Sequence, residues 1–220
     1  MPQPLFARRW FAACLLALCL ALPASAAAGL IGPQIKSVLL KASDRALDKL
    51  ARPAAFVTDN RVRIVLPAPF TERSTPAGLA DQAELTNDLK GSLNQAAVEV
   101  AGEARPVFHA VIARLTVKGS IGIIGKDDGA TNYFRQTATP ELRAALRPLV
   151  RRAMQRSGAF GYLDTLHSIV DFGPGLPALR EHLVDSTTDQ ILRGIFIYIA
   201  DAEDDFRDDP LSGIGLFKGL

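Results

Sequence analysis

Cysteine is almost missing from this chain of 220 residues, and its two copies, Cys14 and Cys19, both lie close to the N-terminus. The rest of the chain has no thiol, which excludes disulfide bonds, a cysteine nucleophile and a thiolate metal site from the folded domain. Histidine is also scarce, with three copies, and no two of them stand three or four residues apart. The sequence therefore has no helical zinc pair and no H-E-x-x-H motif, and we predict no metal ligands.

The chain also lacks a large excess of charge of one sign. Its formal net charge is +2, and Arg8 and Arg9 account for it because no acidic residue precedes Asp44. Beyond these two arginines, 23 basic residues balance 23 acidic ones. A neutral domain has no overall excess of basic residues for binding nucleic acid, so we predict no nucleic-acid partner.

The one long apolar run, Trp10 to Leu22, follows the arginine pair and precedes the small residues from Pro23 to Ala28. This order of basic head, apolar middle and A-x-A cleavage site predicts a signal peptide over residues 1–26, cleaved near Ala26. The run is shorter than the roughly 20 residues that span a membrane, so we expect no permanent anchor. We expect residues 27–220 to fold in the periplasm, and the Arg8–Arg9 pair leaves Sec and twin-arginine export both open.

After the signal peptide, apolar residues recur mostly at helical spacing, which predicts an all-α, single helical domain. The predicted helices cover residues 35–50 and 79–100, a third begins near Pro106, and two more follow. The exception is Arg61–Pro67, where alternating β-branched residues predict one extended arm that lies across the helices.

Two helix starts are predicted from local capping signals. Thr139-Pro140-Glu141 has the pattern of an N-cap followed by a proline in the first turn, and Pro148 should kink or split the helix that follows. The run Ser186 to Asp189 resembles a capping box at the start of the last helix. In that helix, we expect Ile195, Phe196 and Ile199 to be core residues.

Several segments together resemble a known family. They are Val62–Pro67, Ala104–Phe108, Gly122–Arg135 and Glu203-x-x-x-Arg207-x-Asp209-Pro210, of which Gly122–Phe134 is the most specific. The chain is similar to the secreted bacterial family catalogued as domain of unknown function 4197. The resemblance implies a mostly helical domain in the periplasm of a Gram-negative bacterium, and it implies no activity. At Lys118-Gly119-Ser120 the chain departs from an expected acidic residue, so no role of that acid transfers here.

The glycine-rich run Gly119 to Lys126 invites comparison with a phosphate-binding P-loop. That motif needs glycine, four residues, glycine, lysine and then serine or threonine. Here Ser120 stands at the first glycine position, and Asp127 follows the lysine. An aspartate would repel phosphate at this point, so the glycines are better explained by a tight turn between two helices, and we predict no cofactor.

The residues that follow form the candidate site, and we predict that Asp127, Asp128, Thr131, Tyr133 and Arg135 bind a ligand. Paired acids can hold a cation, and tyrosine and arginine can hold a polar group. The alternative is that Asp127 or Asp128 simply caps the helix that continues through Thr131.

A second acidic run lies further along the chain, between Asp201 and Asp209. It indicates either a solvated helix end or a cation site.

No catalytic residue is assigned, because the chain has no G-x-S-x-G elbow, although a triad assembled from distant residues stays open. We predict a non-catalytic binding or interaction module for an apolar ligand or an envelope protein. The apolar, glycine-containing tail Leu211–Leu220 fits such a role. The alternative is an enzyme or cation-binding protein with its site around Asp127, Asp128, Tyr133 and Arg135.

Overall fold

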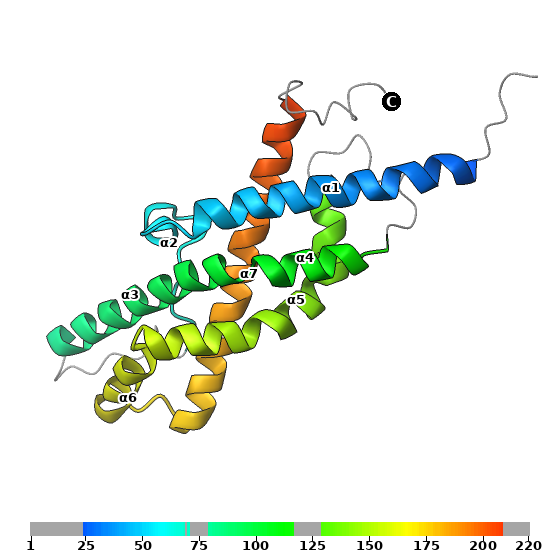
Figure 1. Ribbon diagram of the computed structural model, residues 1–220. Coiled ribbons are helices and arrows are strands. Elements are labelled where there is room, and N and C mark those ends of the chain that lie inside the picture. The colour runs from blue at the N-terminus through cyan, green and yellow to red at the C-terminus, as the bar shows by residue number, and fades with distance from the viewer. Residues whose placement is uncertain (1–23, 69, 71–78, 117–128, 209–220) are drawn as a thin grey trace, which may run out of the picture.

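Helices account for almost all regular structure in the computed structural model, which describes residues 24–68, 70, 79–116 and 129–208 (Figure 1). They are α1 (Ala24–Leu50), α2 (Ala55–Thr58), α3 (Leu79–Glu103), α4 (Arg105–Arg114), α5 (Gly129–Arg156), α6 (Ala159–Ile169) and α7 (Leu176–Asp208). These ranges contain no strand, so the prediction of an all-α fold is confirmed. None of the described helices is long and apolar enough to cross a membrane.

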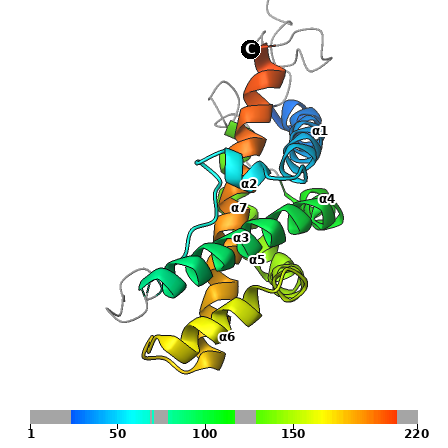
Figure 2. The same ribbon diagram turned by 90° about the vertical axis from the view of Figure 1, so that its left-hand side faces the viewer.

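The 33-residue helix α7 crosses the other long helices and packs mainly against α1 and α5 (Figures 1 and 2). Ile195 and Ile199 are fully buried and Phe196 is nearly so, which confirms their predicted place in the core. Phe196 meets Phe134 edge-on at a centroid distance of 5.7 Å, and Phe134 meets Phe108 at 6.1 Å. This row of aromatic rings joins α7, α5 and α4 in one core.

The predicted helix over residues 35–50 is confirmed as part of α1. Its apolar stripe faces the core and is buried, while Lys41 and Arg45 are exposed. The helix ends at Leu50, three residues before Pro53, as the missing N–H of proline requires.

The predicted helix start at Thr139 is wrong, because α5 runs without interruption from Gly129 to Arg156 and contains Pro140 and Pro148. The expected split at Pro148 is wrong as well. Both prolines are exposed, so water can solvate the carbonyl groups that lose a helical partner there. The Thr139 hydroxyl donates back to Arg135 O at 2.5 Å instead of capping forward.

The predicted start of the last helix at Ser186 is also wrong, because α7 begins ten residues earlier, at Leu176. Thr187 and Thr188 are fully buried inside the helix, and the Thr188 hydroxyl donates to Val184 O at 2.7 Å. The hydroxyl therefore bonds to the preceding turn of an existing helix. Pro177 occupies the first turn, where the missing N–H costs nothing.

The extended arm is confirmed, and it lies across α3 and α7, as its hydrogen bonds show. Val62, Ile64 and Leu66 are buried, and the alternate residues Arg61, Arg63 and Val65 are exposed. An arm without a neighbouring strand needs other partners for its backbone groups.

Two buried amide side chains supply those partners. Asn94 of α3 accepts from Ile64 N at 3.0 Å and donates to Ile64 O at 3.2 Å. Gln190 of α7 does the same for Val65, at 2.9 Å in both directions. Each amide thus replaces one residue of a neighbouring strand.

The arm also needs close approach to α7, and Gly194 permits it. A Cβ atom at Gly194 would lie 3.2 Å from Val62 Cβ and 3.4 Å from Phe56 Cε1. Glycine at this point of α7 lets the arm and α2 pack directly on the helix backbone.

Candidate functional site

The candidate site predicted from sequence lies at the start of α5. Asp127 and Asp128 lie outside the described residues, and Thr131, Tyr133 and Arg135 lie on the first two turns of the helix. The three described side chains do not converge on one point. Thr131 is fully buried, Tyr133 is half-buried and Arg135 is exposed.

Thr131 is bonded to a carboxylate from α7, that of Glu203. Glu203 accepts from Ala130 N at 3.0 Å, from Thr131 N at 2.8 Å and from the Thr131 hydroxyl at 2.6 Å. The first N–H groups of a helix have no partner within the helix, and its N-terminus carries partial positive charge. Glu203 therefore provides a cap for α5 from 72 residues away.

Sequence reasoning did not identify this cap, and considered only Asp127 and Asp128 for that role. A signal was present, because Glu203 follows Phe196 and Ile199 at helical spacing and so falls on the buried face of α7. A carboxylate on such a face requires hydrogen-bond partners. Glu203 is only 7 % exposed, and the backbone N–H groups at the N-terminus of α5 are the donors that its carboxylate requires.

Tyr133 brings the end of α4 to the start of α5. Its hydroxyl donates to Thr116 O at 2.5 Å. Together with the Glu203 contacts, this bond holds the chain on both sides of residues 117–128. We refer to Thr116, Ala130, Thr131, Tyr133 and Glu203 as the loop base.

Arg135 lies over Phe196, a residue of α7 outside the loop base. Its guanidinium carbon lies 5.5 Å from the centre of the Phe196 ring, a cation–π distance. The flat guanidinium group covers the edge of the aromatic core on the solvent side. Its remaining N–H donors are exposed to solvent.

Two acids of the acidic run in α7 form ion pairs with basic residues of other segments. Asp205 pairs with Arg45 at 3.0 Å and with Lys49 at 3.8 Å, both from α1. Asp201 pairs with Arg61 of the arm at 2.9 Å. Among the described residues, no three His, Cys, Asp or Glu side chains are grouped so that they could hold a metal ion.

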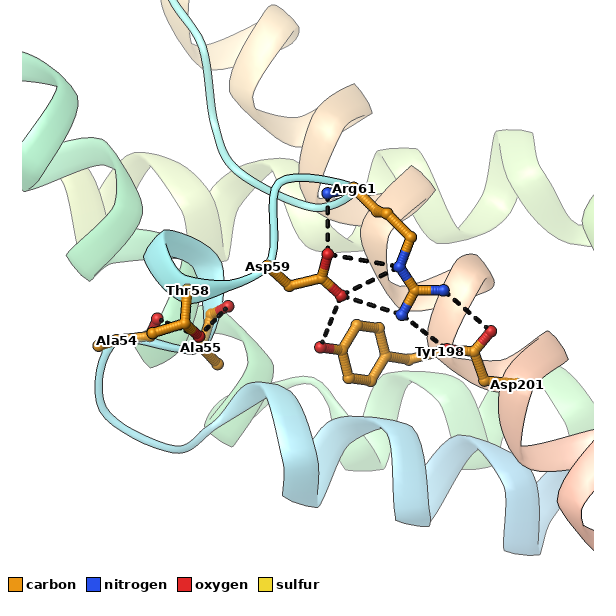
Figure 3. Close-up of polar contacts among 7 residues, drawn as sticks. All are labelled: Ala54, Ala55, Thr58, Asp59, Arg61, Tyr198 and Asp201. Atoms are coloured by element: carbon orange, nitrogen blue, oxygen red, sulfur yellow. Dashed lines mark hydrogen bonds and ion pairs between the residues drawn. The ribbon is translucent and has the colours of Figure 1, made fainter.

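A second polar network joins the start of the arm to α7 (Figure 3). Arg61 lies between two carboxylates, with its Nη2 atom 2.9 Å from Asp59 Oδ2 and 2.9 Å from Asp201 Oδ2. The Tyr198 hydroxyl donates to Asp59 Oδ2 at 3.1 Å. This network holds the arm where it leaves α2.

The network also shifts the proton affinity of its members. Hydrogen bonds from Arg61 lower the pKa of Asp59 below its ordinary value of 3.8. Burial raises the pKa of the Tyr198 hydroxyl above its usual value, and the Asp59 carboxylate raises it further. Asp59 is therefore ionised and Tyr198 neutral at ordinary pH, as their hydrogen bond requires.

Comparison with known proteins identifies one family. The family model described as "Protein of unknown function (DUF4197)" matches residues 27–214, which is most of the chain. No curated protein and no solved structure matches the chain. The match covers the arm, the loop base and the described part of α7.

Proposed function

The chain belongs to the DUF4197 family of proteins of unknown function, and we propose that it is an exported, non-catalytic interaction module. In this proposal the segment between α4 and α5, residues 117–128, contacts an envelope protein. The loop base holds this segment at both ends and is the observation that supports the proposal.

The length of the segment supports a role beyond joining two helices. Residues 115–128 separate α4 from α5, and the Tyr133 hydroxyl of α5 lies 2.5 Å from Thr116 O at the start of this connection. Connections between packed helices usually need about 2–8 residues, and longer ones are more often functional. The connection from α4 to α5 is longer than this range.

The composition of the segment suits contact with a protein. Ile121, Ile123 and Ile124 alternate with glycines, and Lys118 and Lys126 flank them. Apolar side chains supply contact area, and the flanking charges favour one orientation of the partner. Binding residues concentrate on loops that a rigid scaffold positions.

The loop base favours a protein partner over a small ligand enclosed within the domain. Thr131 and Glu203 are buried and bonded to each other, and Phe134 is packed between two other aromatic rings. A ligand inserted among them would have to displace these contacts and leave buried polar groups without partners. A partner that contacts the adjoining segment from outside has no such cost.

The test is crosslinking in living cells of the source bacterium. A photoreactive amino acid replaces Ile123 in one variant and Ile169 in a control variant, since Ile169 is an exposed residue of α6 with 45 % exposure. We expect a discrete protein adduct from position 123 that is missing from position 169. The same adducts from both positions, or none from position 123, would refute the proposal.

The alternative, a cation or enzyme site at Asp127, Asp128, Tyr133 and Arg135, has its own test. Changing Asp127 and Asp128 to Asn preserves helix capping, because Asn caps nearly as well as Asp. Loss of a bound divalent metal in the double variant, without an adduct at position 123, would favour the alternative.

Export is part of the proposal and is tested separately. N-terminal sequencing of the protein from a periplasmic extract should find a first residue between Ser25 and Gly29. An uncleaved chain in the membrane fraction would contradict export.

A further inference from the structure

A polar hollow of about 460 Å³ lies along one side of α7, apart from the loop base. This volume falls within the lower part of the range typical of small-molecule sites. Its lining residues repeat at helical spacing and form one stripe of the helix: His182, Asp185, Ser186, Asp189, Gln190 and Arg193.

On one side of the stripe, arginines of α5 hold the two aspartates. Arg143 Nε lies 2.6 Å from Asp189 Oδ1, and Arg147 Nε lies 2.6 Å from Asp185 Oδ1. Each ion pair fixes a carboxylate and neutralises its charge, while lone pairs remain on both oxygens.

On the other side, the arm holds two more lining residues. Gln190 binds the backbone of Val65 and is only 8 % exposed. His182 Nε2 lies 2.9 Å from Ala68 O, and a carbonyl only accepts, so Nε2 donates this hydrogen bond and Nδ1 is the ring nitrogen that remains for a ligand. Gln190 Nε2 also donates to the Ser186 hydroxyl at 3.1 Å, which leaves the hydroxyl proton to be donated elsewhere.

Arg193 differs from the other charged residues of the stripe. It is exposed, and no carboxylate lies within ion-pair distance of it in the described part of the chain. Asp185 and Asp189 pair with Arg147 and Arg143, and Glu181, which shares Arg147, pairs also with Arg151. These three acids and three arginines balance, so Arg193 leaves the hollow with one positive charge in excess.

From this arrangement we propose that the hollow binds a small anion with several hydroxyl groups, such as a sugar acid or a sugar phosphate. The acidic group pairs with Arg193, and the Ser186 hydroxyl donates to an oxygen of the ligand. Hydroxyl groups of the ligand donate to Asp185, Asp189 and His182 Nδ1.

The local charges explain why the ligand offers hydroxyl groups rather than an ammonium group to the aspartates. Arg143 and Arg147 already pair with the two carboxylates, and Arg193 adds a positive charge, so a further positive charge would be repelled. Neutral hydroxyl donors satisfy the same acceptors without that cost. The side chains of Asp185, Asp189 and Gln190 are already held by their partners, so binding requires little ordering of these three residues.

Isothermal titration calorimetry with the whole exported chain tests this proposal. The probes are D-gluconate, which carries a carboxylate, and D-glucose 6-phosphate, which carries a phosphate, with D-glucose and L-serine as neutral and zwitterionic comparisons. We expect gluconate or glucose 6-phosphate to bind at least about tenfold more tightly than glucose and serine, since Arg193 contributes a charge-assisted hydrogen bond. The preferred probe also shows whether a carboxylate or a phosphate fits better.

Matched variants assign any binding to the hollow. Arg193→Gln should weaken the preferred probe by about tenfold or more, and Arg152→Gln, at an exposed arginine of α5 outside the hollow, should leave its affinity unchanged. Unchanged affinity in Arg193→Gln, equal loss in Arg152→Gln, or no binding of either anion would overturn the proposal. Because the loop base does not contribute to the hollow, these results are independent of the crosslinking at position 123.

Discussion

Truncation of Glu203 is the sharpest test of how the domain is assembled. In Glu203→Ala the carboxylate disappears, and the backbone N–H groups of Ala130 and Thr131 lose their buried acceptor. Each unsatisfied buried donor costs about 1–3 kcal/mol. The favourable interaction of the carboxylate with the positive end of α5 is lost as well. Removing the buried charge also removes its desolvation penalty, which offsets only part of these losses. We expect the free energy of unfolding to fall by about 2–6 kcal/mol, the cost of leaving two buried donors unsatisfied.

Less drastic changes separate the contributions. Glu203→Gln keeps the length of the side chain and one acceptor oxygen, but it turns an NH₂ group toward N–H donors. We expect a loss of about 1–3 kcal/mol, between that of Glu203→Ala and the wild type. Asp205→Ala is the matched control, because it removes an exposed acid of the same helix, whose ion pair with Arg45 of α1 contributes at most about 1 kcal/mol.

Urea unfolding monitored by circular dichroism at constant m-value gives these free energies. The order should be Asp205→Ala, then Glu203→Gln, then Glu203→Ala, with increasing loss. If Glu203→Ala stays within about 0.5 kcal/mol of the wild type, as surface substitutions do, then Glu203 does not hold the start of α5.

Three further substitutions test the core and the arm, each by the same unfolding measurement. Phe196→Ala should cost about 3–5 kcal/mol because it truncates a buried aromatic ring, and a cost near zero would mean that α7 is not central. Gly194→Ala should destabilise by about 1–2 kcal/mol, because crowding against Val62 exceeds the gain in helix propensity, and a more stable variant would show that the arm can shift. For Asp59, a pKa lowered by Arg61 means that its stabilising effect is present above the ordinary pKa of 3.8 and is lost as the pH falls. The stability difference between wild type and Asp59→Asn should therefore shrink between about pH 5 and pH 2, and a constant difference would rule out this linkage.

The sequence by itself determined the helical class, the helix over residues 35–50, the extended arm and the core residues of α7. These features follow from local patterns, because the spacing of apolar residues decides which face of an element can be buried. Val62, Ile64 and Leu66 alternate over a few residues, so the arm could be predicted without knowing what it contacts.

Local capping signals failed where tertiary contacts replace them. Thr139-Pro140-Glu141 has the pattern of a helix start, yet α5 already begins at Gly129 because Glu203 satisfies its first N–H groups. Of the predicted site residues, Thr131 bonds to Glu203 and Tyr133 to Thr116, partners that local sequence does not reveal.

Only the tertiary structure decided which distant groups satisfy one another. Asn94 and Gln190 replace neighbouring strands for the arm from 30 and 125 residues away, and Glu203 caps α5 from 72 residues away. A buried donor needs an acceptor within about 3 Å, and at such separations along the chain only helix packing can bring the two together.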